Sequence, residues 1–164
     1  MTPEKQRKPI LVTGAPRTGT TWTGRMLNLS SDIGFIYEPF NIVRRPTCKK
    51  VQIGLLVYTC PPESNEEYYK KQMQSILNYD YRFFENLTKA RDLIDGYLFV
   101  KSYLEFNYNK FNKKRPLVKD PVAIFSAEWL YKTFDMDVFV TIRHPAAFVS
   151  SFKKLGWTYD YNHF

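Results

Sequence analysis

The sequence predicts an α/β fold in which a central parallel β-sheet is flanked by helices. Two observations predict it: short runs of β-branched and other apolar residues recur along the chain, and amphipathic segments with helical spacing separate them. Strands that alternate with helices are typical of a parallel sheet with right-handed crossovers. The 164 residues, 44% of them hydrophobic, suffice for a single domain with its own core.

The amino-terminal half contains two expected strands. The first covers residues 9–13, PILVT, and is followed by glycine; a helix is expected at 20–29, where Trp22, Met26 and Leu29 have helical spacing. The second strand is expected at 34–37, GFIY, shortly before a proline. Residues 48–63 contain an apolar run and two prolines and remain unassigned. A polar, aromatic-rich helix is expected from residue 65 to about 93.

The carboxyl-terminal half continues the alternation. Residues 97–113 show no clean period and several asparagines, so we interpret them as a mobile or acceptor-facing region. The remaining strands are expected at 116–119 and 138–142, and the remaining helices at 123–134 and 145–155. The last helix has proline at its first position, where a missing N–H costs little. We take 9–13, 116–119 and 138–142 as the core strands.

Composition limits the partners and the compartment. Lys and Arg outnumber Asp and Glu by 24 to 16, a net charge of +8, which suggests an anionic partner such as phosphate, sulfate, nucleic acid or an acidic glycan. Nucleic acid is not expected, since the basic residues form no dense run and no nucleic-acid motif is present. Cys48 and Cys60 cannot build a disulfide framework, and no Cys/His spacing predicts a metal site. Without a visible signal peptide or spanning helix, we expect a cytoplasmic protein; a lumenal domain is the alternative if the native N-terminus is missing.

The strongest local signal is the loop GAPRTGTTW at residues 14–22. A strand, a glycine-bearing loop and a helix in this order aim backbone N–H groups and a positive helix end at an anion. Gly14 and Gly19 have the spacing of the nucleotide P-loop, but Thr20 occupies the position of its lysine and the loop's only cation is Arg17. The loop therefore suits one phosphate-like group better than a magnesium triphosphate. An ordinary strand-to-helix turn is the alternative.

The stretch PRTGTTW resembles the 5′-phosphosulfate loop of sulfotransferases, P-[KR]-[ST]-G-T-T-W. These enzymes transfer a sulfuryl group from 3′-phosphoadenosine 5′-phosphosulfate (PAPS) to an alcohol or amine. The resemblance implies that Arg17 contacts the bridging and sulfate oxygens. It also implies that the 5′-phosphate is wrapped by Thr18, Gly19, Thr20, Thr21 and Trp22.

The same family binds the 3′-phosphate with an arginine at a strand end and a serine eight residues later. Here VFVTIRHPAAFVSSF supplies Arg143 and Ser151, with Ser150 as the neighbouring alternative. An arginine and a hydroxyl can hold one phosphate through charge-assisted hydrogen bonds. Taken alone, the two residues would be interpreted as a salt-bridged arginine and a solvated serine.

Two further motifs supply candidates for the chemistry. Glu38 ends the second strand in a Y-E-P segment that resembles carbohydrate sulfotransferases, and we expect it to be the catalytic base; the alternative is a loop anchor paired with Arg44 or Arg45. LVKDP, residues 117–121, resembles an element of tyrosylprotein-type and bacterial sulfotransferases. That resemblance implies that Lys119 stabilises the sulfuryl group, with Arg17, and that Asp120 orients Lys119 or a loop. A surface ion pair is the alternative.

The sequence thus predicts a PAPS-dependent sulfotransferase that acts on a hydroxyl, carbohydrate-type acceptor. Its partners would be a small-molecule donor and that acceptor, which residues 48–115 are expected to bind. We expect residues 1–164 to be one sulfotransferase domain, truncated at its C-terminus because such domains are commonly longer. A P-loop nucleotide kinase and a non-catalytic basic module that binds anions are the alternatives.

Overall fold

The computed structural model describes residues 7–40, 66–80 and 93–156. In chain order the elements are β1 (Ile10–Gly14), α1 (Thr20–Leu27), β2 (Ile33–Tyr37), α2 (Glu66–Leu77), α4 (Leu93–Phe111), β3 (Arg115–Lys119), the 3₁₀ helix η2 (Val122–Ser126), α5 (Ala127–Phe134), β4 (Asp137–Thr141) and α6 (Pro145–Lys154). The unassigned residues 48–63 lie outside the described residues, as do residues 81–92 of the predicted helix.

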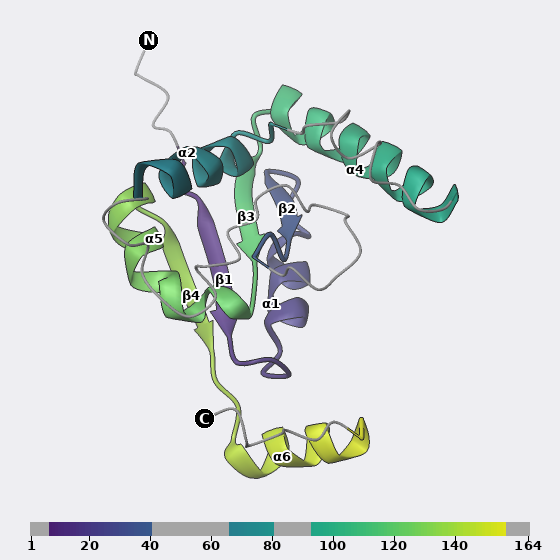
Figure 1. Ribbon diagram of the computed structural model, residues 1–164, viewed down its shortest axis with the longest axis vertical. Coiled ribbons are helices and arrows are strands. Elements are labelled where there is room, and N and C mark those ends of the chain that lie inside the picture. Colours follow the sequence, from purple (N-terminus) through teal and green to yellow (C-terminus); the bar gives the residue numbers. More distant parts are fainter. Residues whose placement is uncertain (1–6, 41–65, 81–92, 157–164) are drawn as a thin grey trace.

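The strands form one four-stranded, all-parallel sheet in the order β2-β3-β1-β4. Lys119, the last residue of β3, is opposite Tyr37, the last residue of β2, and opposite Val12 of β1, which continues to Gly14. The carboxyl ends of the three strands therefore lie at one edge of the sheet. Helices flank the sheet, α1 on one face and α2 with α5 on the other (Figure 1). The predicted α/β class and parallel sheet are confirmed.

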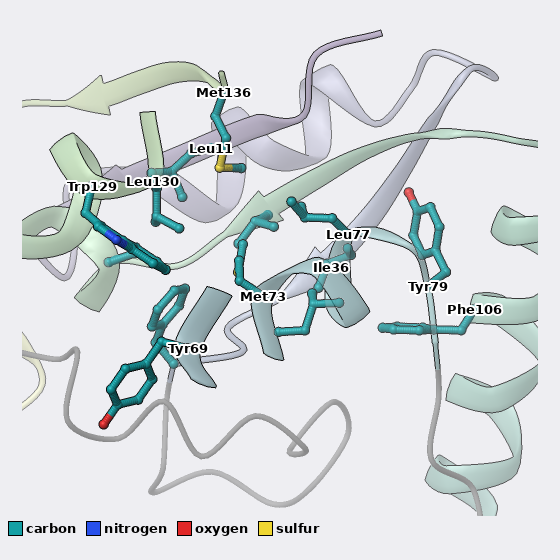
Figure 2. Close-up of a cluster of buried hydrophobic side chains, with 14 residues drawn as sticks. Leu11, Ile36, Tyr69, Met73, Leu77, Tyr79, Phe106, Trp129, Leu130 and Met136 are labelled. Carbon is teal, nitrogen blue, oxygen red and sulfur yellow. The ribbon is translucent and has the colours of Figure 1, made fainter. Parts of the chain in front are cut away.

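Alternation of side chains along the strands builds two hydrophobic layers. Leu11, Ile36 and Val118 point into the larger core, which α2 and α5 cover with Tyr69, Met73, Ile76, Leu77, Trp129 and Leu130 (Figure 2). The alternate residues Ile10, Val12 and Leu117 point to the other face, where α1 covers them with Leu27. A parallel sheet needs both faces covered, which is why its strands are apolar almost throughout.

Leu130 tests this core because its side chain is fully buried. Leu130→Ala should lower the free energy of unfolding by about 2–5 kcal/mol, through lost burial and the cavity left behind. Leu104→Ala on α4 is the matched control, because that leucine is 61% exposed; its effect should stay within about 0.5 kcal/mol. Urea unfolding followed by circular dichroism measures both, and equal effects would contradict the described packing.

Helix α4 differs from the expectation of an aperiodic segment at 97–113. Its apolar residues surround the whole helix, and only some of them, such as Phe99 and Phe106, are buried, so no single stripe marks it in the sequence. Asn107 in the helix and Asn112 just after its end donate side-chain hydrogen bonds to the carbonyls of Tyr103 and Tyr108, 2.8 and 2.7 Å away.

Helix α2 ends earlier than the predicted 65–93 helix. Tyr79 adopts a left-handed conformation (φ 56°), and the N–H of Asp80 closes the last turn by bonding to the carbonyl of Ser75, 2.9 Å away. Strand β4, expected among the core strands, instead lies at the sheet edge, with Phe139 and Val140 about half exposed. None of the described helices combines the length and apolar character that crossing a bilayer requires.

Candidate functional site

The loop between β1 and α1 has a backbone that requires glycine at its start. Gly14 has φ 146°, and a Cβ there would lie 2.4 Å from the carbonyl oxygen of Thr141 on β4. Thr18 fastens the loop from inside: its hydroxyl donates to the carbonyl of Ala15 at 2.7 Å and lies 2.7 Å from the hydroxyl of Thr141. The single proton of the Thr141 hydroxyl is shared between Thr18 and the carbonyl of Thr13, which lies 3.3 Å away. The loop is therefore a fixed structure held against β4.

Helix α1 opens at this loop without a side-chain cap. Gly19 is its N-cap residue (φ 104°), no side chain caps the helix, and its first turn holds no acidic residue. Uncapped N–H groups and the positive end of the helix dipole favour an anion at this position. Of the predicted loop residues, Thr20 is buried and Trp22 is 69% exposed.

Arg17, Arg143 and Ser151 come together although they are far apart in the sequence. Arg17 has a left-handed backbone (φ 70°), and its Nε donates to the hydroxyl of Ser151 on α6 at 3.1 Å. Arg143, at the end of β4, donates from Nη1 to the carbonyl of Arg17 at 3.0 Å. Ser151 is buried whereas its neighbour Ser150 is exposed, and Ser151 makes the contact.

The two arginines have no carboxylate partner among the described residues. Arg7 and Arg115 differ, since Arg7 pairs with Asp32 and Arg115 pairs with Asp137. An arginine carries five N–H donors, so the single bond that each makes here leaves donors for a ligand. Within the described residues, two guanidinium groups without a carboxylate partner near a helix N-terminus that has no side-chain cap are suited to holding an anion.

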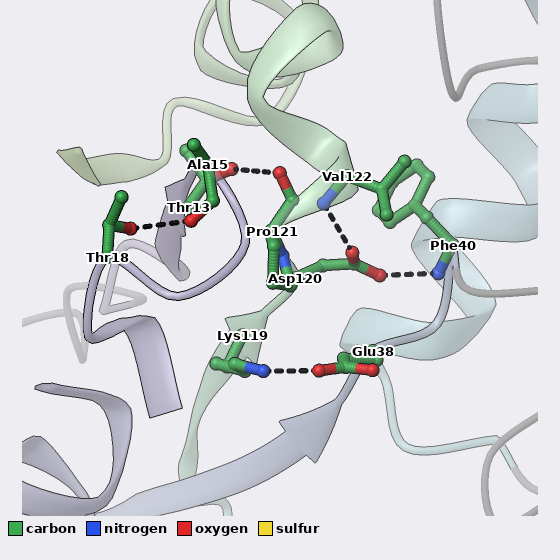
Figure 3. Close-up of polar contacts among 9 residues, drawn as sticks. All are labelled: Thr13, Ala15, Thr18, Glu38, Phe40, Lys119, Asp120, Pro121 and Val122. Carbon is green, nitrogen blue, oxygen red and sulfur yellow. Dashed lines mark hydrogen bonds and ion pairs between the residues drawn. The ribbon is translucent and has the colours of Figure 1, made fainter. Parts of the chain in front are cut away.

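Glu38 and Lys119 form a buried ion pair at the same edge of the sheet (Figure 3). The Lys119 side chain is 1% exposed and that of Glu38 is 9% exposed. The backbone N–H of Glu38 donates to the carbonyl of Lys119 at 2.8 Å, which extends the β2–β3 ladder by one bond. The Lys119 ammonium also lies 4.5 Å from the ring centre of Tyr37, within cation–π range.

The methylene chain of Lys119 packs against helix α1. A Cβ on Gly24 would lie 2.8 Å from the ring of Phe35 and 3.3 Å from Cγ of Lys119. Glycine at this position lets the helix approach the sheet closely, and the side chain of Lys119 is confined as a result. The ammonium is thereby aimed at Glu38 and the strand ends.

Asp120 lies next to this pair, but the hydrogen bonds of its carboxylate go to backbone groups of other residues. Its carboxylate accepts the backbone N–H of Phe40 at 2.7 Å and that of Val122 at 2.9 Å (Figure 3). The side chain is fully buried, and burial raises its pKa to about 7 against the pull of these two N–H groups. Of the two expected roles, orienting Lys119 or orienting a loop, the geometry matches the loop.

Sequence reasoning named most of these groups but missed two. Thr141 of β4 contacts Thr18 in the loop between β1 and α1, and Tyr37 lies against the Lys119 ammonium. A threonine and a tyrosine inside short strands look like ordinary strand residues, so no local signal could have singled them out. Arg44 and Arg45, the alternative partners of Glu38, lie outside the described residues.

The carboxyl ends of all four strands therefore supply the site: the loop after β1, Glu38 after β2, Lys119 on β3 and Arg143 after β4. Ligands bind at this edge in open α/β sheets. Among residues 7–40, 66–80 and 93–156, no group of three or more His, Cys, Asp or Glu side chains is arranged to hold a metal ion. Fold and site together define an α/β protein whose strand ends carry basic and hydroxyl groups suited to an anionic ligand.

Comparison with known families gives this class a specific assignment. The model described as "Sulfotransferase family" matches residues 9–164, nearly the whole chain, so the chain belongs to that family and is a transferase. The suspected family resemblance is confirmed. Neither the curated proteins nor the solved structures contain a match.

Proposed function

We propose that this chain transfers a sulfuryl group from PAPS to a hydroxyl of a carbohydrate-type acceptor. The observation that carries the proposal is the meeting of Arg17, Arg143 and Ser151 around an uncapped α1 N-terminus that has Thr20 where a nucleotide P-loop has lysine. PAPS has two anionic ends, a 5′-phosphosulfate and a 3′-phosphate. Arg17 and the α1 N-terminus suit the first, and Arg143 with Ser151 suits the second.

The reaction needs a base for the hydroxyl proton and charge stabilisation for the sulfuryl group. The acceptor oxygen forms a bond to sulfur while the bond from sulfur to the bridging oxygen breaks, and adenosine 3′,5′-bisphosphate leaves. In this proposal Glu38 takes the proton, and Arg17 and Lys119 stabilise the sulfuryl oxygens and the departing phosphate. An ammonium has three N–H donors, so Lys119 can contact the donor while its contact with Glu38 persists.

The carbohydrate assignment rests on the Y-E-P segment around Glu38, which resembles carbohydrate sulfotransferases. It is tested with a panel of acceptors: a hydroxylated sugar, an amino sugar and a tyrosine-containing peptide, each with PAPS. Sulfation of the sugar hydroxyl alone supports the proposal. Sulfation confined to the peptide or the amine would overturn the acceptor assignment but keep the donor.

The donor assignment is tested by calorimetry. The protein should bind adenosine 3′,5′-bisphosphate more tightly than ATP, and EDTA should not change either affinity, because the loop lacks the lysine that serves a magnesium triphosphate. An EDTA-sensitive preference for ATP would favour a P-loop kinase. Tight binding of an oligonucleotide with no preference between the two nucleotides would favour a basic anion-binding module.

Arg143→Ala should weaken binding of adenosine 3′,5′-bisphosphate by about 10- to 150-fold, since it removes a charge-assisted contact worth about 1.5–3 kcal/mol. Lys132→Ala is the matched control: it also removes one positive charge, but Lys132 is exposed on α5 and pairs with Glu128. Calorimetry at fixed ionic strength measures both. Equal losses would indicate a general charge effect, and undiminished affinity in Arg143→Ala would contradict the assigned phosphate contact.

A further inference from the structure

Asp120 is a charged group that nothing in the proposed chemistry uses. It is fully buried, and its carboxylate has one backbone N–H on each side, Phe40 beyond the end of β2 and Val122 at the start of η2. These three positions come from two segments about 80 residues apart in the chain. Asp120 therefore joins the chain that leaves β2 to the chain that leaves β3.

The segment held in this way carries Glu38. Glu38 has a left-handed backbone (φ 44°), a conformation that is costly for a residue with a Cβ and persists only where surrounding contacts fix it. Its N–H is bonded to the carbonyl of Lys119 on one side, and Phe40, two residues later, is bonded to Asp120 on the other. The two acceptors, the Lys119 carbonyl and the Asp120 carboxylate, belong to consecutive residues of the K-D-P motif.

The inference rests on the proposed function, in which Glu38 is the base. We propose that Asp120 is a positioning residue: its carboxylate, by holding the N–H of Phe40, fixes the turn that aims Glu38 at the acceptor hydroxyl and at Lys119. Asp120 itself touches neither donor nor acceptor. Its contribution is to the geometry of the base, and a displacement of about 1 Å of a reacting group can cost about 10²-fold in rate.

The ionised carboxylate is the form that performs this task. A carboxylate accepts hydrogen bonds on both oxygens, whereas the protonated acid converts one oxygen into a donor and weakens one of the two N–H contacts. Within the part of the chain that the structure describes, the charged groups that act on Asp120 are Glu38, which follows β2, and Lys119, the last residue of β3. The neighbouring sequences of β1 (ILVTG) and η2 (VAIFS) contain no ionisable side chain.

Burial places this ionisation in the neutral range, since it raises the pKa of Asp120 to about 7. Asp120 therefore binds its proton more tightly in the folded protein than in the unfolded chain, where the pKa of an aspartate is near 3.8. Stability therefore falls as pH rises from about 4 to about 7, while the positioning contact improves over the upper part of that range. A buried group that lowers stability when ionised and lies beside the site is consistent with a functional role.

The test compares Asp120→Asn with the wild-type protein and with Asp137→Asn, an equal charge change on β4 at the opposite end of the sheet. An asparagine keeps one acceptor but turns an N–H donor toward the second backbone N–H. In Asp120→Asn we expect kcat at pH 8 to fall by about 10- to 100-fold. Affinity for adenosine 3′,5′-bisphosphate should change by less than about threefold, because the donor contacts lie elsewhere.

The pH profile separates positioning from mere stabilisation. Wild type and Asp137→Asn should show kcat rising through a midpoint near pH 7, and Asp120→Asn should lose that limb because an amide does not titrate. A limb that survives in Asp120→Asn, a kcat within about threefold of wild type, or a parallel collapse of donor affinity would each overturn the proposal.

A measurement on the wild-type protein keeps the proposal testable if Asp120→Asn does not fold. The amide signals of Phe40 and Val122 in ¹⁵N-resolved spectra should shift together, with the same midpoint near pH 7 as the kcat limb. Signals that do not titrate, or that titrate with a different midpoint, would overturn it. Because these spectra require no turnover, they also distinguish a failure of this inference from a failure of the proposed sulfotransfer, which the acceptor panel reports.

Discussion

Glu38→Gln should lower kcat by about 10²- to 10⁴-fold, the usual contribution of a general base. The substitution keeps the shape of the side chain and leaves an amide oxygen near the Lys119 ammonium, but it removes the group that would take the hydroxyl proton. Affinity for adenosine 3′,5′-bisphosphate should be almost unchanged, because Arg17, Arg143 and Ser151 are untouched. Initial rates with saturating PAPS and a sugar acceptor that carries a free hydroxyl measure kcat, and calorimetry measures donor affinity.

The control for this variant is Glu67→Gln, the same chemical change on an exposed position of α2. It should leave kcat unchanged within about twofold, since exposed ion pairs contribute little. Turnover of Glu38→Gln close to that of the wild type would place the base elsewhere, and residues 48–115 would then be the region to search. A loss of donor affinity as large as the loss of kcat would also contradict the assignment, since a base should affect the chemical step.

The strands were predictable because a parallel sheet covered on both faces leaves an apolar run for each strand. All four expected strands are present, within about one residue at each end. Edge and central strands could not be distinguished in this way: residues 138–142, VFVTI, are the most apolar of the four expected strands, yet the corresponding strand β4 lies at the sheet edge. Helix α4 was not predicted because its apolar residues are spread around the helix and only part of them is buried, so the sequence shows no helical period.

The site was predictable as far as topology and motif spacing reach. Parallel strands end at one edge, so the loop after β1, Glu38 and Lys119 were expected to converge there, and they share that edge. The contacts themselves were beyond the sequence. The ion pair between Glu38 and Lys119 spans 81 residues, and the bond from Arg17 to Ser151 spans 134. Such pairings depend on the strand register and on where α6 lies, which no local pattern encodes.

Lys119→Met should lower kcat by about 10²- to 10³-fold, the cost of removing one preorganised donor to a developing negative charge. Methionine keeps an unbranched stem that fits beside Gly24 and loses only the ammonium. The variant leaves Glu38 buried without its cation, and losing one partner of a buried pair typically costs about 3–5 kcal/mol of stability. Rates must therefore be measured at a temperature where circular dichroism shows the variant to be folded.

The double variant Glu38→Gln/Lys119→Met separates the two effects of Lys119. With no charge left buried at this position, most of the lost stability should return, and a melting experiment would detect the recovery. Activity should not return, because both the base and the ammonium are absent. Because Glu38→Gln alone already lowers kcat, the effect of Lys119 is obtained by comparing the double variant with that single variant. A double variant that turns over as fast as Glu38→Gln would mean that Lys119 serves only to neutralise Glu38 in the folded protein. Recovered stability together with a kcat well below that of Glu38→Gln assigns Lys119 to the stabilisation of the transferred sulfuryl group.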